Sequence, residues 1–111
     1  MTTPLDAFGI LDLRIGTVLS AAPFVEARVP AIKLEIDFGP ELGVRRSSAQ
    51  LTKRYEPGNL VGRQVVAAVN LGVRRIAGFA SEVLVLGGVP EKGDVVLLAL
   101  DAAVPNGTRV A

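Results

Sequence analysis

Strict alternation of apolar and charged side chains in one short segment requires this chain to contain at least one β-strand. Residues 32–38, IKLEIDF, carry an apolar side chain at every even position and a charged one at every odd position. Successive side chains of a strand point to opposite faces, so this pattern predicts a strand with one buried face. A weaker alternation covers residues 13–20, where Gly16 in mid-strand predicts a bulge or a sharp bend.

The rest of the chain predicts further short strands separated by glycine and proline. Extended runs, one polar and three apolar, predict strands over residues 44–51, 64–71, 82–86 and 95–100. Glycine and proline predict loops or turns between the strands, at residues 22–30, 39–43, 57–62, 72–80 and 87–90.

Capping signals predict one short helix over residues 4–10, because Thr3 is a good N-cap residue and Pro4 suits a first turn. A helical turn is predicted over residues 52–55. Five or six short strands within 111 residues suit a small closed barrel or a sandwich. We therefore predict a single all-β domain over residues 1–111, a five-stranded OB-fold barrel with short N-terminal and connecting helical turns.

The chain has no Cys and no His, which narrows the chemistry that it can perform. Disulfides, zinc–thiolate sites and thiol nucleophiles are excluded, as are the commonest general base and the commonest transition-metal ligand. Phosphate-binding glycine motifs do not occur, and the carboxylates are scattered. Three serines could pair with a lysine as a catalytic dyad, but no strand-to-helix elbow flanks them. We expect no enzyme activity, no catalytic residue, no metal and no cofactor.

The net charge is +1, so binding of a polyanion would depend on a local basic patch. Half of the 12 basic residues form three pairs, Arg45-Arg46, Lys53-Arg54 and Arg74-Arg75. Two interpretations remain open: solvated charges that protect a sheet edge, or a basic groove for a phosphate backbone or an acidic peptide. Hydrophobic residues make up 50% of the chain, which predicts a dense core and an apolar face buried against a second copy.

Membrane insertion is not expected from the sequence. The longest uncharged stretches, residues 15–25 and residues 64–73, are far shorter than the about 18 residues that a membrane-spanning helix needs. The N-terminal residues lack the basic lead and the apolar core of a secretory signal. A cytoplasmic location is therefore expected.

Five segments occur in an order that is typical of one protein family. Residues 26–39, EARVPAIKLEIDFG, and residues 45–51, RRSSAQL, are followed by 60–70, 79–87 and 95–109. Together they resemble CsaA, a family of small, export-related, chaperone-like bacterial proteins within the wider group of tRNA-binding OB-fold domains. The resemblance implies a homodimer without a catalytic site that binds unfolded or exported polypeptides and the translocase ATPase SecA.

The tRNA-binding members of the wider group share motifs that this chain keeps only in part. Their Asp-x-Arg-x-Gly is present as residues 12–16 and their Asn-Leu as residues 70–71, but Ile32 replaces the acid of their Ala-Asp-Lys-Leu. Their Ser-Gly-Ile is AQL here, at residues 49–51, and their Ser-x-Gly-Met is SEVL, at residues 81–84. In those relatives this serine and methionine lie on the tRNA-binding face. The loss of Gly and Met therefore favours the CsaA branch.

We expect polypeptide to bind on the face that the relatives use for tRNA, with a charged rim around an apolar centre. The residues predicted to bind peptide or RNA are Lys33, Arg45, Ser48, Asn70, Arg74, Arg75, Phe79, Ser81 and Leu84. The predicted partners are a second copy of this chain and unfolded polypeptides or preproteins, with SecA and weakly bound tRNA as further candidates. The dimer is expected to use apolar surface near Phe8, Ile10, Val83 and Val95. A tRNA-binding OB-fold module is the alternative function.

Overall fold

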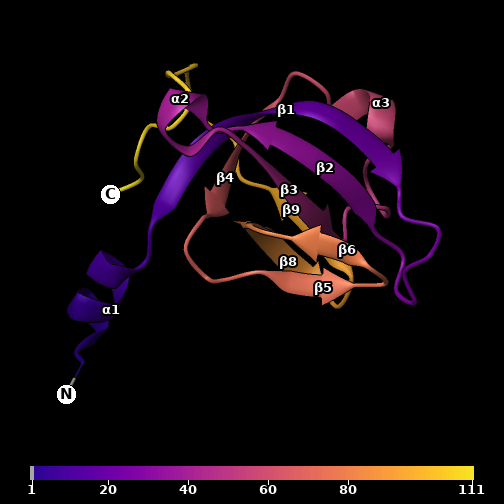
Figure 1. Cartoon of the computed structure of the whole chain (residues 1–111), viewed down its shortest axis with the longest axis horizontal. Coiled ribbons are helices and arrows are strands. Elements are labelled where there is room, and N and C mark those ends of the chain that lie inside the picture. The colour runs from indigo at the N-terminus through magenta and orange to yellow at the C-terminus, as the bar shows by residue number, and fades with distance from the viewer. Residues whose placement is uncertain (1) are drawn as a thin grey trace.

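A computed structural model describes residues 2–111, and its main feature is a five-stranded antiparallel sheet coiled into a barrel (Figure 1). The strand order is β3-β2-β1-β4-β7. The bounds of these strands are β1 Leu13–Pro23, β2 Ile32–Asp37, β3 Val44–Ala49, β4 Gln64–Ala68 and β7 Leu84–Val85. The prediction of an all-β, five-stranded barrel with short helices is confirmed.

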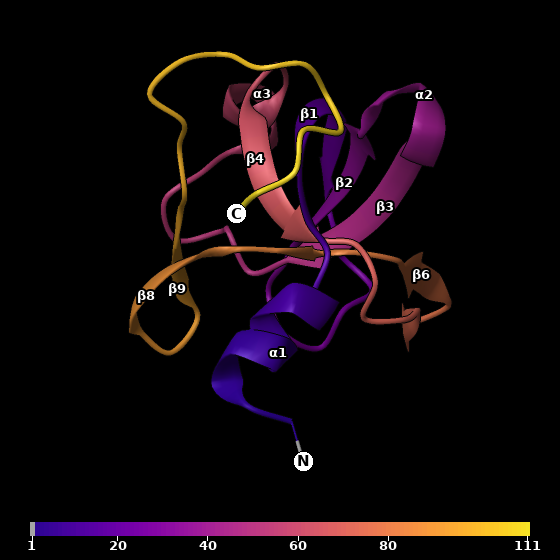
Figure 2. The ribbon, with the colours of Figure 1, turned by 90° about the vertical axis from the view of Figure 1, so that its left-hand side faces the viewer.

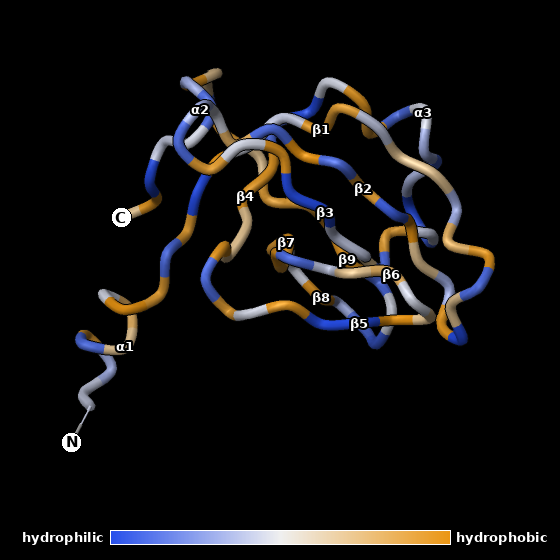
Figure 3. The backbone as a smooth tube through the Cα atoms, in the orientation of Figure 1, coloured by the Kyte–Doolittle hydropathy of each residue, from blue (hydrophilic) through white to orange (hydrophobic). Residues whose placement is uncertain are grey.

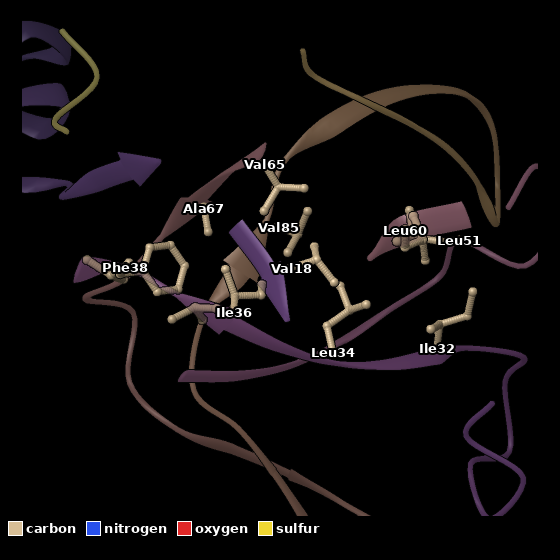
Figure 4. Close-up of a cluster of buried hydrophobic side chains, with 12 residues drawn as sticks. Val18, Ile32, Leu34, Ile36, Phe38, Leu51, Leu60, Val65, Ala67 and Val85 are labelled. Carbon is tan, nitrogen blue, oxygen red and sulfur yellow. The ribbon is translucent and has the colours of Figure 1, made fainter. Parts of the chain in front are cut away.

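The core of the barrel consists of the side chains that the alternation in residues 32–38 predicts to be buried. Ile32, Leu34, Ile36 and Phe38 are each at most 1% exposed, while Glu35 between them is exposed. They pack with side chains from β1, β4, β7 and the connecting segments, among them Val18, Val65, Val85, Leu51 and Leu60 (Figure 4). Period-two patterning therefore determines both the strand and the face that it buries.

Strand β1 is long enough to pair with two neighbours, with β4 through residues 13–17 and with β2 through residues 17–23. The register irregularity lies between Val18 and Ser20, not at Gly16. Gly16 pairs regularly with Val65 and lies directly against the ring of Phe38, where a Cβ atom would approach the ring carbons to 2.7 Å. The bulge predicted at Gly16 is therefore wrong in position, and this glycine serves close packing instead.

Helix α1, Pro4–Ile10, has the predicted bounds and the predicted cap. The Thr3 hydroxyl accepts a hydrogen bond from the Asp6 amide, and the Asp6 carboxylate accepts one from the Thr3 amide, which completes a capping box. None of its seven residues is buried, and the helix extends away from the barrel (Figures 1 and 2). Its position is therefore not explained by packing within this chain.

Two more short helices and two hairpins complete the described residues. Their bounds are α2 Gly39–Leu42, α3 Pro57–Leu60, β5 Arg74–Ile76, β6 Phe79–Ser81, β8 Gly87–Glu91 and β9 Asp94–Leu97. The sequence predicted loops or turns where the structure has α2, α3, the β5–β6 hairpin and β8. These predictions are wrong because such short helices and strands depend on tertiary contacts, which the local sequence does not show. The strands predicted over 64–71 and 95–100 are real but shorter. The helical turn predicted over 52–55 is a hydrogen-bonded turn over 52–54.

The C-terminal segment is held against the start of β1. The Ile15 amide donates to the Thr108 carbonyl, and the Gly107 amide donates to the Ile15 carbonyl. Arg14 adds a bond to the Gly107 carbonyl at 3.0 Å and pairs with Asp12 at 2.6 Å, and these contacts with Asp12 raise the pKa of the guanidinium. Within residues 2–111 no helix combines the length and the apolar character that crossing a bilayer requires.

Candidate binding cleft

A cleft of about 540 Å³ opens beside the barrel, between β3, the β5–β6 hairpin and β7. Its walls come from five separate parts of the chain: residues 26–31, residues 48–51, the hairpin around Arg74 and Ile76, residues 84–85, and Val95 of β9. The lining is mainly apolar, with Glu26, Arg28 and Arg74 as its charged members. Mainly apolar clefts with a few polar groups are typical ligand sites. The cleft is therefore the strongest candidate for a functional site.

The outer wall next to the cleft carries two aromatic rings covered by cations. Phe24 and Phe79 meet edge to face, with their centroids 5.3 Å apart. The Lys33 ammonium lies 5.3 Å from the Phe24 ring centroid and 5.7 Å from that of Phe79. The Arg46 guanidinium lies 5.3 Å from the Phe79 centroid. We call these four residues the aromatic cluster, and their contacts fix two positive charges on one apolar surface.

The end of β6 and the residue after it, Ser81 and Glu82, hold the aromatic cluster against the edge of β3. The Glu82 carboxylate accepts from the Arg46 amide at 3.0 Å, and the Ser81 hydroxyl accepts from the Ser48 amide at 3.0 Å. The Glu82 amide in turn donates to the Arg46 carbonyl at 2.8 Å. Along part of the β3 edge, side-chain oxygens therefore accept the amide hydrogen bonds that carbonyls of a neighbouring strand would otherwise accept.

The tip of the β5–β6 hairpin has an unusual backbone conformation at the rim of the cleft. Ala77 and Gly78 both have positive φ, 47° and 81°. Two central residues with positive φ are the mark of the type I′ turn, whose twist matches that of a two-residue hairpin. Glycine adopts this conformation readily, whereas Ala77 does so at a cost. The tight turn keeps Arg74 and Ile76 at the cleft wall.

An ion pair between exposed Arg54 and buried Asp94 holds the β8–β9 hairpin, which contributes Val95 to the cleft. Both carboxylate oxygens of Asp94 accept from Arg54, at 2.6 and 2.9 Å. The hydrogen bond from Arg54 lowers the pKa of Asp94, although desolvation of the carboxylate opposes this effect. The Tyr55 hydroxyl accepts from the Leu97 amide at 3.1 Å. The turn after β3 therefore positions this wall through polar contacts.

The structure brings six of the nine residues predicted to bind peptide or RNA into one region. Ser48, Arg74 and Leu84 line the cleft. Lys33 and Phe79 belong to the aromatic cluster, and Ser81 joins the two regions through its bond to the Ser48 amide. Leu84 is 51% exposed while Val83 is buried, so the outward orientation considered for Leu84 is confirmed.

The other three residues lie apart from this region. The Arg45 guanidinium donates to the Leu42 carbonyl at 3.0 Å. Asn70 accepts from the Asp12 amide and donates to the Ile10 carbonyl, both at 2.8 Å, so its side chain ties α1 to the barrel. Arg75 is exposed on β5, where successive side chains point to opposite faces, so it lies opposite Arg74. These three residues do not line the cleft, and their role in binding stays a prediction.

Sequence analysis missed three residues of the region, Phe24, Arg46 and Glu82. Phe24 lies in the segment read as a loop, and nothing local marks it as a partner for Phe79. Arg46 could have been selected over Arg45 only from the strand register, which pairs it with Glu35 on the face of Lys33. Among residues 2–111, no group of three or more acidic side chains is arranged to hold a metal ion.

The fold and the cleft define a class, a small OB-type barrel with a mainly apolar cleft beside it. Comparison with known proteins then specifies the family. The chain belongs to the family described as "putative tRNA binding domain", whose model matches residues 13–109. The resemblance proposed from the sequence is confirmed at this level.

Relatives of two kinds share this domain. The methionine–tRNA ligase of Methanothrix thermoacetophila is 40% identical over 107 residues, which are 96% of this chain but 15% of the ligase. The chain thus spans less than a sixth of the length of that relative. Solved structures of chaperone CsaA match over the full length of both chains. The protein from Bacillus anthracis is 61% identical with a TM-score of 0.93, and that from Picrophilus torridus is 39% identical with a TM-score of 0.89.

Proposed function

We propose that this chain is a non-enzymatic, chaperone-like protein whose cleft binds extended, unfolded polypeptide. The observation that carries the proposal is where the chain departs from the tRNA-binding pattern. Residues 49–51 replace Ser-Gly-Ile and residues 83–84 replace Gly-Met, and these two segments are more than 30 positions apart in the sequence. Residues 49–51 and Leu84 all line the same cleft.

Four residues that keep the tRNA-binding pattern, Asp12, Arg14, Gly16 and Asn70, have structural roles. Arg14 and Asp12 hold the C-terminal segment, Gly16 packs under Phe38, and Asn70 ties α1 to the barrel. Preservation of these residues therefore supports the same barrel and says little about its ligand. The similarity to the solved structures of chaperone CsaA supports the interpretation as a polypeptide-binding protein.

The chemistry of the cleft suits polypeptide better than nucleic acid. Exposed Leu84 offers apolar contact without directional hydrogen bonds, which suits a ligand of variable sequence. The Phe79 ring already contacts Phe24, Lys33 and Arg46, which compete with a base for stacking on it. The nearby cations add attraction for acidic segments of a client.

A tRNA-binding module remains the second candidate, because the family and the ligase relatives favour it. The net charge of +1 provides no long-range attraction for a polyanion. Binding of tRNA is therefore expected to be weak and to depend on a few cations such as Lys33, Arg46 and Arg74. Each phosphate contact contributes about −0.9 for duplex, or about −0.7 for single strands, to the slope of log binding constant against log salt concentration.

Parallel titrations test the function. Reduced and carboxymethylated α-lactalbumin serves as a permanently unfolded client, and native α-lactalbumin and bulk tRNA are the comparison ligands. We expect binding of the unfolded client at 150 mM salt, no binding of the native protein, and loss of the tRNA complex as salt rises. A tight tRNA complex that persists at that salt, without binding of the unfolded client, would establish the tRNA-binding module instead.

We further propose that the chain works as a homodimer through α1. Leu5, Phe8 and Ile10 of this helix are exposed, and an isolated seven-residue helix is marginal in water. An apolar face on a second copy would supply the missing packing. We expect light scattering at micromolar concentration to give twice the mass of one chain, and Phe8→Asp to give one chain with an unchanged barrel. A single-chain mass for the parent protein would refute the dimer.

The proposal also covers which polypeptides the chain binds and whether SecA is a partner. The resemblance to CsaA suggests that the clients are preproteins met in the cytoplasm before Sec-dependent export, with SecA as a partner. A pull-down with purified SecA, with and without an unfolded preprotein, tests this step. Failure of SecA to associate would leave polypeptide binding in place and remove the link to export.

A further inference from the structure

The barrel has a seam between its two terminal strands. In the sheet order β3-β2-β1-β4-β7, β3 and β7 stand at opposite ends, and no ladder joins them within residues 2–111. They are nevertheless neighbours in space, because the Ser47 hydroxyl donates to the Val83 carbonyl at 3.0 Å and the two strands run close together (Figure 3). The cleft lies along this seam, since residues 48–51 and 84–85 both line it.

The β3 side of the seam presents main-chain groups that are only partly covered. Side chains of Glu82 and Ser81 accept from the amides of Arg46 and Ser48. The amide and the carbonyl of one strand residue point to the same side of the strand, so the Ser48 carbonyl faces the seam as the Ser48 amide does. The Gln50 amide, which follows at the cleft, donates to no group within the described part of the chain.

The β7 side of the seam presents a second free edge. Leu84 pairs with β4, and the Leu86 amide donates to the Val66 carbonyl at 2.8 Å. The same alternation turns the amide and the carbonyl of Val85 away from β4. They face the side on which the Val83 carbonyl accepts from Ser47. Donors and acceptors of two edges therefore face one cleft.

We propose that the bound polypeptide enters this seam as an added β-strand, with its main chain paired to Ser48 near the end of β3 and to Gln50, which follows β3. This inference rests on the proposed function and specifies its mode. Strand addition takes affinity from main-chain hydrogen bonds, which every polypeptide offers whatever its sequence. Alternate side chains of the added strand face Leu84 and Ile76, so apolar residues at every second position are favoured.

The seam also discriminates between classes of ligand. A strand edge offers amide donors and carbonyl acceptors in alternation, and only another extended main chain matches both at the same spacing. A phosphate backbone carries acceptors alone, so it leaves the carbonyl of Ser48 unpaired. Folded proteins expose few free edges, which restricts binding to unfolded segments.

An N-methyl scan of a probe peptide tests strand addition without changing the protein. The probe is acetyl-Glu-Leu-Thr-Leu-Thr-Leu-Glu-amide, synthesised also with a single N-methyl group at each position in turn. Methylation removes one main-chain donor, so we expect affinity to fall about two- to tenfold at every second position. At the other positions we expect a change of less than about twofold. A loss that does not alternate would overturn strand addition.

The failures of the two proposals are distinguishable. If the unmethylated probe does not bind but carboxymethylated α-lactalbumin does, the polypeptide function stands and strand addition is overturned. If neither binds, both are overturned. Amide hydrogen exchange supplies an independent readout, in which the probe should slow exchange at Gln50 at least tenfold and leave exposed Ala102 unchanged. Unchanged exchange at Gln50 in the complex would contradict pairing to β3.

Substitution at Gln50 tests the same bond from the protein side. Gln50→Pro removes the amide donor, and it costs no hydrogen bond in the free protein because that amide has no partner within residues 2–111. Gln50→Ala removes the same side chain and keeps the donor, so it is the matched control. We expect the proline variant to bind the probe two- to tenfold more weakly and the alanine variant to bind as the parent does. Equal binding by the two variants would refute the bond.

Discussion

Leu84→Ser is the sharpest single perturbation of the proposed cleft. Leu84 is 51% exposed at the cleft, so a client can cover about half of its side chain. Full burial of a leucine side chain contributes about 1.5–3 kcal/mol, so covering half contributes about 1 kcal/mol, or about fivefold in Kd. Serine keeps the strand and removes the apolar contact. We expect the variant to bind carboxymethylated α-lactalbumin about fivefold more weakly, by fluorescence anisotropy.

A matched control separates this effect from a general loss of surface hydrophobicity. Leu19 is 49% exposed on β1 and does not line the cleft. Leu19→Ser should bind the client as the parent does. Both variants should keep the parent's melting temperature within a few degrees, because neither leucine is part of the buried core. An unchanged Kd for Leu84→Ser, or an equal loss for Leu19→Ser, would refute the assignment of the cleft.

Two further predictions concern the scaffold of the site. Gly16→Ala places a Cβ atom about 2.7 Å from the Phe38 ring and should lower the free energy of unfolding by about 1–3 kcal/mol in urea titrations, whereas Gly58→Ala meets open space and should leave it within about 0.5 kcal/mol. Because Arg54 lowers the pKa of Asp94, the stabilisation is present above pH about 4 and is lost as the pH falls through the lowered value. The parent should therefore exceed Asp94→Asn in stability at pH 7, and the difference should shrink at pH 3; a constant difference would contradict this.

The strands and the N-terminal helix could be predicted because their signals are local. The alternation in residues 32–38 is complete, and burial follows it position by position. The capping box of Thr3 and Asp6 lies within four residues, so it marks the start of α1 without knowledge of the rest of the chain. Such local patterns predict the structure correctly because the folded chain makes the same contacts that the patterns imply.

The membership of the aromatic cluster could not be predicted, because it depends on register. Period two shows that Arg45 and Arg46 face opposite sides of β3 but not which of them shares a face with Lys33. The pairing of Glu35 with Arg46 decides the question, and that register is a property of two strands together. The contact of Phe24 with Phe79 joins positions 55 residues apart and has no trace in local composition.

The seam itself follows from where the chain leaves the barrel after β7. A longer β7 could pair along β3 and close the sheet, but residues 87–91 pair with β9 instead. Gly87 permits this departure, since a Cβ atom there would lie 2.5 Å from the Val96 carbonyl oxygen. The Arg54–Asp94 pair then holds the β8–β9 hairpin in place through polar contacts. The β8–β9 hairpin therefore has two effects: it shortens β7, which leaves the edge of β3 open, and it contributes Val95 to the apolar lining of the cleft.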